Sequence, residues 1–568
     1  MNRALVHAAP LRLAPALTIA AFAGPIVAGL IGTLLPAFGV LPSIGGETLS
    51  LAPWRALLGF PGFATSLELT LATGWFATLM AVFITFGLGA LLHHRPAVRR
   101  LGSVLAPLLA MPHSALAIGF AFLITPSGWL ARWVSPALSG WTIPPDIASV
   151  GHPSGWALVV CLLLKEVPYL MLMTLGALNQ VNPLAYGNAA RALGYSPVQA
   201  FFKVILPQVY PQIRLPILAV LAFSLSVVDV AMILGPGNPP TLAVLALRWF
   251  SDPDVTQYFQ AAAAASLLLG VVLASIGVWI LLERLAARWG GQWIARGQRG
   301  GAAAASVAVL GGGLGALLYA AALLSMTGMA LWSVAQRWRF PEALPQAFTA
   351  ANWQNQLGDL QRPALNTLIV AAVATLIALA LSLACLENET GHSQRGAARR
   401  NLLLLYLPLL IPQLAFLFGA QVLLIRSGLD GGLFAVVWSH LVFVLPYLFL
   451  SLADPWRAFD PRYARTALSL GASRWRVFWA VKLPILLKPT LIACAVAFAV
   501  SVGLYLPTLF AGSGRVATLT TEAVTLSAGA DRRVIGTWAV LQAAFPLAAY
   551  LLAAWLPRLL YMRRQGLR

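Results

Sequence analysis

The stretch NAARALGYSPVQAFFKVILP at residues 188–207 decides the fold, because a second version of it, RTALSLGASRWRVFWAVKLP, occupies residues 465–484. The two copies start 277 positions apart. Each places a glycine, Gly194 or Gly471, thirteen residues before its closing proline. A repeat of this length predicts a chain of two equivalent halves.

Each copy is predicted to form a helix, a turn and a second helix. Gly194 suits the left-handed conformation that ends many helices, since glycine has no Cβ. Ser196 is placed to cap the following helix, with Pro197 at its first position, and Ser473 is its equivalent in the second copy. An ordinary surface hairpin is the alternative for one copy alone. Two copies between apolar segments argue against that alternative.

The composition places the chain in a membrane. Of its 568 residues, 60% are hydrophobic and 10% are charged, which excludes an ordinary soluble protein. A membrane-spanning helix needs about 20 residues, and twelve segments qualify. They are residues 15–40, 65–92, 101–125, 155–178, 205–234, 258–283, 303–334, 364–386, 401–425, 432–452, 486–510 and 534–557. The predicted fold class is all-α and integral to the membrane, with two homologous six-helix halves.

The charge distribution predicts the orientation. Six crossings in each half return the chain to the same side, so both repeated loops are predicted to face the cytoplasm. Most Lys and Arg residues fall in the loops and tails that share the side of the N-terminus, which is the positive-inside pattern. The net charge of +20 therefore indicates topology and contact with the lipid bilayer rather than nucleic-acid binding. Both termini are predicted to be cytoplasmic.

The predicted organisation has three parts. Residues 1–285 form a first half whose loop is residues 184–207, residues 286–302 are a cytoplasmic linker, and residues 303–568 form a second half whose loop is residues 461–484. We call the two loops the first loop and the second loop.

The repeat extends beyond the two loops. The further matched pairs are Thr70-Leu71 with Thr367-Leu368, Pro168-Tyr169 with Pro446-Tyr447, and Thr241-Leu242 with Thr518-Leu519. Their spacing falls from 297 to 278 and 277, and a longer outer loop at residues 126–154 accounts for the change. The outer stretches 45–66 and 340–365 are each predicted to form a short helix at the membrane interface, anchored by Trp54 or Trp353.

Both loops resemble the signature cytoplasmic loop of permease subunits of binding-protein-dependent ABC importers, Glu-Ala-Ala-x-x-x-Gly-x9-Ile-x-Leu-Pro. Asn188 and Arg465 stand where that family usually has glutamate, which affects the polar contacts expected with the ATPase. The residues that match the signature, and that the resemblance assigns to ATPase coupling, are Ala189, Ala190, Gly194, Leu206 and Pro207 in the first loop and Ala467, Gly471, Leu483 and Pro484 in the second.

The resemblance implies a fold like that of type I ABC importer permeases and a fused layout similar to the iron(III) and thiamine type. It implies two copies of a separate ATP-binding subunit and a periplasmic solute-binding protein as partners, in a bacterial inner membrane. The solute would be small, such as iron(III) or thiamine, and selectivity would lie largely with the binding protein. Alternating access would be driven by movement of the two loops.

The chain itself is predicted to need no cofactor and to hydrolyse no ATP. A P-loop needs the pattern Gly-x4-Gly-Lys-Ser/Thr to hold phosphates, and none of the four lysines follows such a pattern. The glycine cluster at residues 311–313 lies in an apolar run and is predicted to serve helix packing. No constellation in the sequence supports a metal site or an enzyme.

Three charged residues within predicted membrane segments are candidates for a functional role. Lys165 and Glu166 lie in the fourth segment and Asp229 in the fifth, and each would cost about 2.5–3.5 kcal/mol at the bilayer centre. They need partners on other helices, and their place is either the translocation path or a structural network. The positions equivalent to Lys165 and Glu166 are Phe443 and Val444, so either arrangement is asymmetric.

Two other classes of function remain as alternatives. A twelve-helix secondary transporter driven by an ion gradient would use Lys165, Glu166 and Asp229 as a relay, but it leaves the repeated loop unexplained. A membrane-embedded enzyme or assembly factor lacks a catalytic constellation.

Overall fold

The computed structural model describes residues 9–95, 98–299, 301–391 and 407–560, and almost all of them are helical. The first half contains α1 (Ala9–Ala37), η1 (Pro42–Ile44), α2 (Ala52–Leu58), α3 (Phe63–Leu92), α4 (Val98–Ala110), α5 (His113–Ile124), α6 (Trp129–Val134), α7 (Trp156–Val181), α8 (Pro183–Ala192), α9 (Pro197–Ala200), η2 (Phe201–Ile205), α10 (Leu206–Ser226), α11 (Asp229–Leu234), α12 (Leu242–Phe250) and α13 (Gln257–Ala295).

The second half repeats this order with fewer interruptions. It contains α14 (Ala302–Val334), β1 (Ala335–Arg337), β2 (Ala347–Phe348), α15 (Ala351–Gly391), α17 (Leu414–Arg426), α18 (Leu433–Arg457), α19 (Pro461–Ser469), α20 (Arg474–Val477), η3 (Phe478–Lys482), α21 (Leu483–Ile485), α22 (Leu487–Gly503), α23 (Leu506–Gly512), α24 (Leu519–Leu526) and α25 (Arg532–Leu560). The turns η2 and η3 are π-helical, and η1 is a 3-10 turn.

The helices agree with a chain of about twelve membrane crossings. Ten helices of the described residues are long and apolar enough to span a membrane, and an eleventh is reached if the bent pair Arg474–Ile485 and Leu487–Gly503 is one span. The shorter apolar helix α17 stands in the predicted segment 401–425, of which residues 401–406 lie outside the described part. The all-α membrane fold is confirmed.

The two halves are interlocked through their first helices. The helix α1 packs against α17 of the second half, and α14 packs against α3 and α5 of the first half. Glycines permit these contacts, because a Cβ on Gly32 would lie 2.9 Å from the Cα of Gly419, and one on Gly311 would lie 2.9 Å from the Cα of Gly87. The packing role predicted for the glycine cluster is therefore confirmed at Gly311, whereas Gly313 has no neighbour within 4 Å of such a Cβ.

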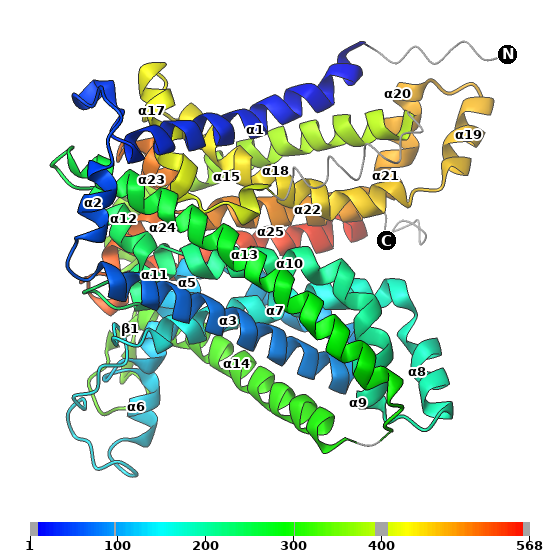
Figure 1. Cartoon of the computed structure of the whole chain (residues 1–568), viewed down its shortest axis with the longest axis horizontal. Helices are drawn as coiled ribbons and strands as arrows, with labels where there is room; N and C mark the ends of the chain where they lie inside the picture. Colours follow the sequence, from blue (N-terminus) through cyan, green and yellow to red (C-terminus); the bar gives the residue numbers. More distant parts are fainter. Residues whose placement is uncertain (1–8, 96–97, 300, 392–406, 561–568) are drawn as a thin grey trace.

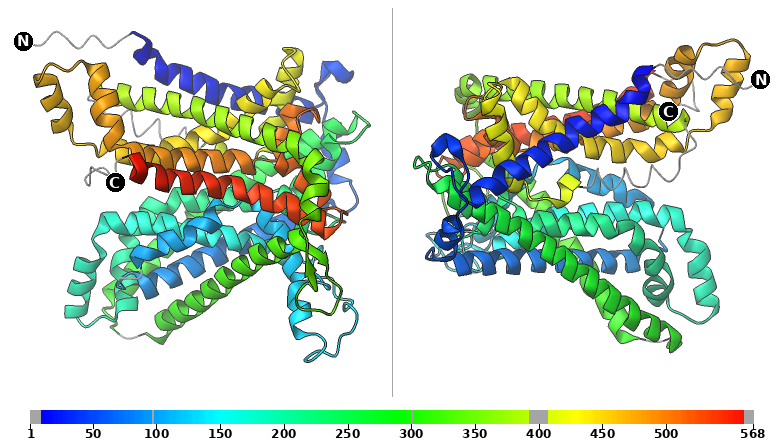
Figure 2. Two further views of the ribbon diagram at one scale, coloured as in Figure 1. Left: turned by 180° about the vertical axis from the view of Figure 1, so that it is seen from behind. Right: turned by 45° about the horizontal axis from the view of Figure 1, so that its top comes forward.

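Both loops lie at one end of the molecule, as predicted from the even number of crossings. Figure 1 places α8 and α9 at the same end as α19 and α20, and Figure 2 shows the two loops as separate projections there. The helix α1 begins and α25 ends toward this end too. The opposite end carries α2, α6 and the strands β1 and β2, which pair antiparallel. We call the two ends the loop end and the outer end.

The outer end differs between the halves. In the first half, α2 is a separate short helix, because the chain turns at Pro61-Gly62 and Gly62 has φ +90°. In the second half the predicted short helix around Trp353 is instead the first part of α15, a continuous helix of 41 residues. No left-handed glycine interrupts α15, so the prediction of a separate interfacial helix is wrong there.

The matched Thr-Leu pairs prove to be contacts between elements. The Thr70 hydroxyl on α3 donates to the Ser66 carbonyl at 2.7 Å and accepts from the Leu242 N–H at the start of α12 at 2.9 Å. The Thr367 hydroxyl on α15 accepts from the Leu519 N–H at the start of α24 at the same distance. Each threonine thus satisfies a backbone donor at a helix start that lies between membrane helices.

Replacing Thr70 with valine should loosen the start of α12. Losing the acceptor for the Leu242 N–H costs about 1 kcal/mol, so the amides there should exchange with deuterium about fivefold faster. Thr73→Val is the matched control, because the buried Thr73 hydroxyl donates to carbonyls of its own helix, with Leu69 at 2.7 Å. Equal exchange at α12 in the two variants would contradict the assignment.

Candidate functional site

The first loop has the geometry that its sequence predicts. The helix α8 ends in a left-handed turn at Gly194, whose φ is +89°, and the Tyr195 N–H donates to the Ala190 carbonyl at 3.1 Å. The Gly194 N–H donates to the Arg191 carbonyl at 2.9 Å, which completes a Schellman motif. Ser196 then caps α9 by accepting from the Gln199 N–H at 3.3 Å.

The second loop repeats this geometry bond for bond. Gly471 has φ +82°, its N–H donates to the Leu468 carbonyl at 3.0 Å, and the Ala472 N–H donates to the Ala467 carbonyl at 3.1 Å. Ser473 caps α20 by accepting from the Arg476 N–H at 3.3 Å. The local predictions for glycine and serine are therefore confirmed in both copies, and the sequence repeat is a structural repeat.

The remaining signature residues frame the two turns. Ala190 is buried, Ala189 is exposed and Ala467 is half-buried. The Leu-Pro pairs lie just after the π-helical turns, with Leu206-Pro207 at the start of α10 and Leu483-Pro484 in α21. The Asn188 side-chain oxygen accepts a hydrogen bond from the Arg191 guanidinium, so this departure from glutamate is used within the loop.

The loops expose apolar side chains at equivalent positions, which sequence reasoning missed. Leu193 is 62% exposed and Leu470 is 82% exposed, and both stand directly before the left-handed glycines. Tyr186 and Tyr463 lie seven residues before these leucines, which is about two helical turns, and both are also exposed. Both pairs have the 277-residue spacing of the repeat. The signal was thus available in the sequence, as a leucine and a tyrosine repeated at the same positions of the two loops.

A buried lysine anchors each loop to the membrane helices. Lys203 of η2 donates to the Gln298 carbonyl at 2.8 Å and lies 4.5 Å from the centre of the Trp293 ring at the end of α13. Lys482 of η3 forms an ion pair with Glu387 of α15 and lies 4.6 Å from the centre of the Trp456 ring on α18. At the 277-residue spacing, Lys203 corresponds to position 480, two residues before Lys482. The spacing of the repeat therefore did not pair the two lysines.

The start of the second loop is fixed by a carboxylate. Asp460 accepts from the Arg462 N–H at 2.9 Å and so caps α19. That backbone hydrogen bond, followed by the Arg462 guanidinium, lowers the pKa of Asp460. The first loop uses Asn182 instead, which accepts from the Ala185 N–H at 3.4 Å.

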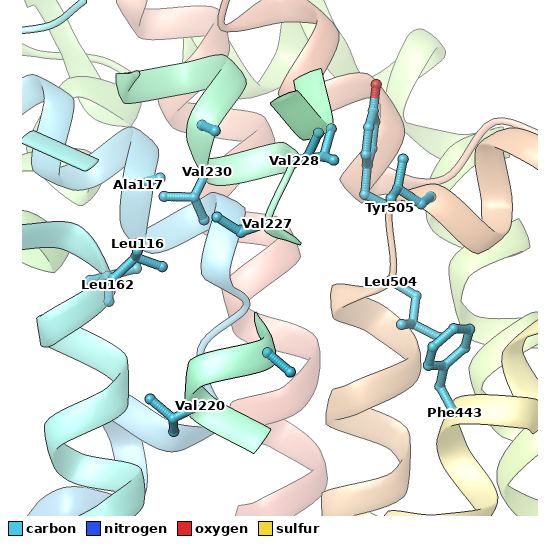
Figure 3. Packing of buried hydrophobic residues seen from close by; sticks show 14 of the residues in the cluster. Leu116, Ala117, Leu162, Val220, Val227, Val228, Val230, Phe443, Leu504 and Tyr505 are labelled. Atoms are coloured by element: carbon cyan, nitrogen blue, oxygen red, sulfur yellow. The ribbon is translucent and has the colours of Figure 1, made fainter. Parts of the chain in front are cut away.

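The helix that follows each loop is broken within the membrane region. The break between α10 and α11 falls at Val227 and Val228, and the break between α22 and α23 falls at Leu504 and Tyr505 (Figure 3). The first residue of each break is extended, with ψ 138° at Val227 and 119° at Leu504. The predicted membrane segments 205–234 and 486–510 are therefore each interrupted by a break.

The two breaks correspond to each other across the repeat. Val227 and Val228 precede Leu504 and Tyr505 by 277 residues, the same spacing as the two loops. Gly503, beside the second break, lies near Pro112, where the predicted segment 101–125 is broken between α4 and α5. The helix α5 packs against α11 and also against α24 and α25. The broken helices of both halves therefore meet in the interior of the molecule.

The hydrogen-bond partners of Lys165 lie at the break between α4 and α5. Lys165 is 7% exposed, and its Nζ donates to the carbonyls of Leu108 at 3.0 Å, Leu109 at 3.1 Å and Met111 at 2.6 Å. These carbonyls lie at the end of α4, where the break leaves them without helical partners. A cation at a helix C-terminus also interacts favourably with the helix dipole. Lys165 therefore caps α4.

Glu166 and Asp229 are placed apart from Lys165. Glu166 is buried and accepts a hydrogen bond from the Ser224 hydroxyl on α10. Asp229 is half-buried and is the first residue of α11, directly after the break. Partners on other helices, as predicted, are confirmed for Lys165 and Glu166. A place on the translocation path remains a prediction for all three.

Two helical halves with matching loops and matching broken helices describe a membrane permease. The model of the family described as binding-protein-dependent transport system inner membrane component matches residues 84–286, which include the first loop and the first break. The chain is similar to the inner membrane ABC transporter permease protein YnjC of Escherichia coli (strain K12), with 35% identity over 543 residues that cover 96% of this chain and 97% of the relative. The chain therefore belongs to the family of ABC transporter permease subunits, as the loop signature predicts.

Proposed function

We propose that this chain forms the translocation pathway of an importer of the inner membrane, driven by two copies of a separate ATP-binding subunit that dock on the first and second loops. A periplasmic binding protein delivers a small solute, such as iron(III) or thiamine, to the outer end. The permease role follows from the family. The partners, their number, the solute and the direction of transport are parts of the proposal.

The observation that carries this proposal is the pair of exposed apolar tips at one end of the molecule. Leu193 and Leu470 stand at equivalent positions of loops with the same hydrogen bonds. Burying a leucine side chain contributes about 1.5–3 kcal/mol, so two such tips favour a partner with two equivalent grooves. A homodimer presents its surfaces in symmetric pairs, and a dimeric ATPase therefore fits.

The anchors of the loops supply a route from the ATPase to the pathway. Closure of the ATPase dimer would move both loops, and Lys203 and Lys482 tie the loops to α13, α15 and α18. The two breaks lie in the helices that follow directly from the loops. Movement of the loops would therefore reach Val227-Val228 and Leu504-Tyr505 and open the pathway toward the outer end.

Charge at a tip should weaken docking of the ATP-binding subunit. Leu470→Asp places a carboxylate in an apolar contact, and we expect binding of the ATP-binding subunit to the purified permease to weaken about tenfold, with the same result for Leu193→Asp. The matched control is Leu138→Asp at the outer end, where the leucine is also highly exposed. Unchanged binding in both loop variants, or no binding to the unmodified permease, would overturn the proposal.

The structure also bears on the alternative of a secondary transporter. That mechanism would need Lys165, Glu166 and Asp229 as an ion relay. The Lys165 ammonium has three carbonyl acceptors at the end of α4, an arrangement typical of a helix cap. Transport by the purified permease in proteoliposomes without an ATP-binding subunit would favour the secondary transporter.

A further inference from the structure

The break in the second half is surrounded by hydrogen-bonding side chains. His440 of α18 is buried, its Nδ1 lies 2.8 Å from the Ser501 hydroxyl on α22, and its Nε2 lies 2.8 Å from the Thr508 hydroxyl on α23. The Thr508 hydroxyl donates to the Leu504 carbonyl at 3.2 Å, so Nε2 carries the proton and Nδ1 accepts from Ser501. One side chain therefore joins the two helical segments on either side of the break.

A second chain of hydrogen bonds holds the same break. The Thr520 hydroxyl of α24 donates to the Val502 carbonyl, beside the break. The Gln542 side chain of α25 donates to Thr520 at 2.6 Å and to the Ser114 hydroxyl of α5 at 2.8 Å. The carbonyls of Val502 and Leu504 thus both accept from threonine hydroxyls. The break is tied to α18, α24, α25 and, across the two halves, to α5.

The first half has hydrocarbon side chains at the corresponding positions. Leu162 stands where the second half has His440, at the 278-residue spacing of this segment, and Ala231 and Ala243 stand where it has Thr508 and Thr520, at 277. These side chains form no hydrogen bonds. The serine is retained as Ser224, but it donates to Glu166 and so joins α10 to α7 without reaching α11.

We propose that His440 is a positioning residue that stiffens the break between α22 and α23, and that the break between α10 and α11 is the one that bends during transport. Both ring nitrogens of His440 are hydrogen-bonded. In the water-poor interior of a membrane protein, such satisfied buried hydrogen bonds rigidify the segments that they join. The two breaks share a backbone geometry but differ in the side chains that hold it. The pathway is therefore gated mainly from the first half. This inference rests on the proposed function for its role in transport.

Matched spin-label pairs across the two breaks test the difference in stiffness. Leu215→Cys with Met232→Cys spans the first break, and Ile492→Cys with Leu509→Cys spans the second at equivalent positions. Each pair is separated by about 25 Å along its helix, within the range of pulsed electron resonance. The native cysteines, Cys161, Cys385 and Cys494, are replaced by alanine. In the permease alone, we expect the first pair to give a distance distribution about twofold wider than the second.

The nucleotide response is measured next on the full complex. With the ATP-binding subunit, ATP and vanadate, the mean distance of the first pair should shift and that of the second should stay unchanged. Exchanging the side chains of the two breaks should also exchange the widths of their distance distributions. His440→Leu with Thr508→Ala gives the second break the residues of the first, and its distribution should widen to match. His440→Gln keeps a donor and an acceptor and should restore the narrow distribution.

The reverse exchange tests the inference if the first variants fail to fold. Leu162→His with Ala231→Thr should narrow the distribution of the first pair and slow ATP turnover of the complex. Equal widths at the two breaks in the unmodified permease would overturn the inference and leave the proposed function intact. Failure of the ATP-binding subunit to bind would overturn the proposed function, and the widths in the permease alone would still decide the inference.

Discussion

Replacing both Gly194 and Gly471 with valine is expected to abolish ATP hydrolysis that depends on the assembled transporter. These glycines have φ of +89° and +82°, a region that costs other residues about 1–2 kcal/mol and a β-branched residue more. At about 2 kcal/mol, each loop would populate its native turn about 30-fold less. Because the two loops are proposed to dock together, the factors multiply to about a thousandfold loss of assembled complex. Co-purification of the ATP-binding subunit measures the loss.

The chain offers a control within the same helix. Gly187 lies inside α8, a Cβ there would meet no atom within 4 Å, and the equivalent position of the second loop already carries Ala464. Gly187→Ala should therefore leave assembly unchanged or slightly improved, since alanine favours helix. A Cβ on Gly471 would also meet no atom within 4 Å, so an effect of its substitution reports backbone conformation alone. If the double valine variant still assembles with the ATP-binding subunit, the proposed role of the two loops in coupling is contradicted.

The loops could be predicted from sequence because their geometry is decided locally. A glycine that ends a helix and a serine two residues later that begins the next act within a few residues of the chain. Gly194 with Ser196 and Gly471 with Ser473 obey these rules, and the structure follows them in both copies. The Thr-Leu pairs were visible for a different reason. Repetition singled them out, although only the structure shows that Thr70 bonds to Leu242.

The broken helices could not be predicted because their cause is not local. Hydropathy continues through Val227-Val228 and Leu504-Tyr505, and no proline or glycine adjoins the first pair. Gly503 and Pro507 flank the second pair, but prolines also stand inside the continuous helix α1, so such residues do not by themselves mark a break. The second break depends on hydroxyls from Thr508 and from a different helix, and those contacts are absent from any window of sequence. Comparison of the halves does reveal the asymmetry, because His440 and Thr508 stand where the first half has Leu162 and Ala231. Lys165 and Glu166 in turn stand where the second half has Phe443 and Val444.

The partners of Lys165 illustrate the same limit. Its burial cost could be stated from sequence, but its acceptors arise from the break at Met111-Pro112, more than fifty residues away. Without that break, a lysine in an apolar segment suggests a charged partner or a water-filled path. With the break, backbone carbonyls at the end of α4 suffice as hydrogen-bond acceptors for the Lys165 ammonium.

Lys165→Met is expected to reduce the yield of folded permease severely. Methionine keeps the apolar stem but removes the donors for the carbonyls of Leu108, Leu109 and Met111. A buried acceptor left without a partner costs about 1–3 kcal/mol, and Lys165 serves three at the end of one helix. The loss should reach about 3 kcal/mol or more, which is a large share of the stability of a membrane bundle. Thermal unfolding of the detergent-purified permease measures it.

The same variant separates the two roles predicted for this lysine. Lys488→Met is the matched control, because Lys488 is exposed on α22 and its loss should leave the unfolding temperature nearly unchanged. If Lys165 acts chiefly on the translocation path, its methionine variant would unfold at the temperature of the unmodified permease and fail only in transport. A low unfolding temperature instead shows that the ammonium holds the broken third segment together. Because Pro112 lies beside Gly503, that result would also link the cap to the geometry of the second break.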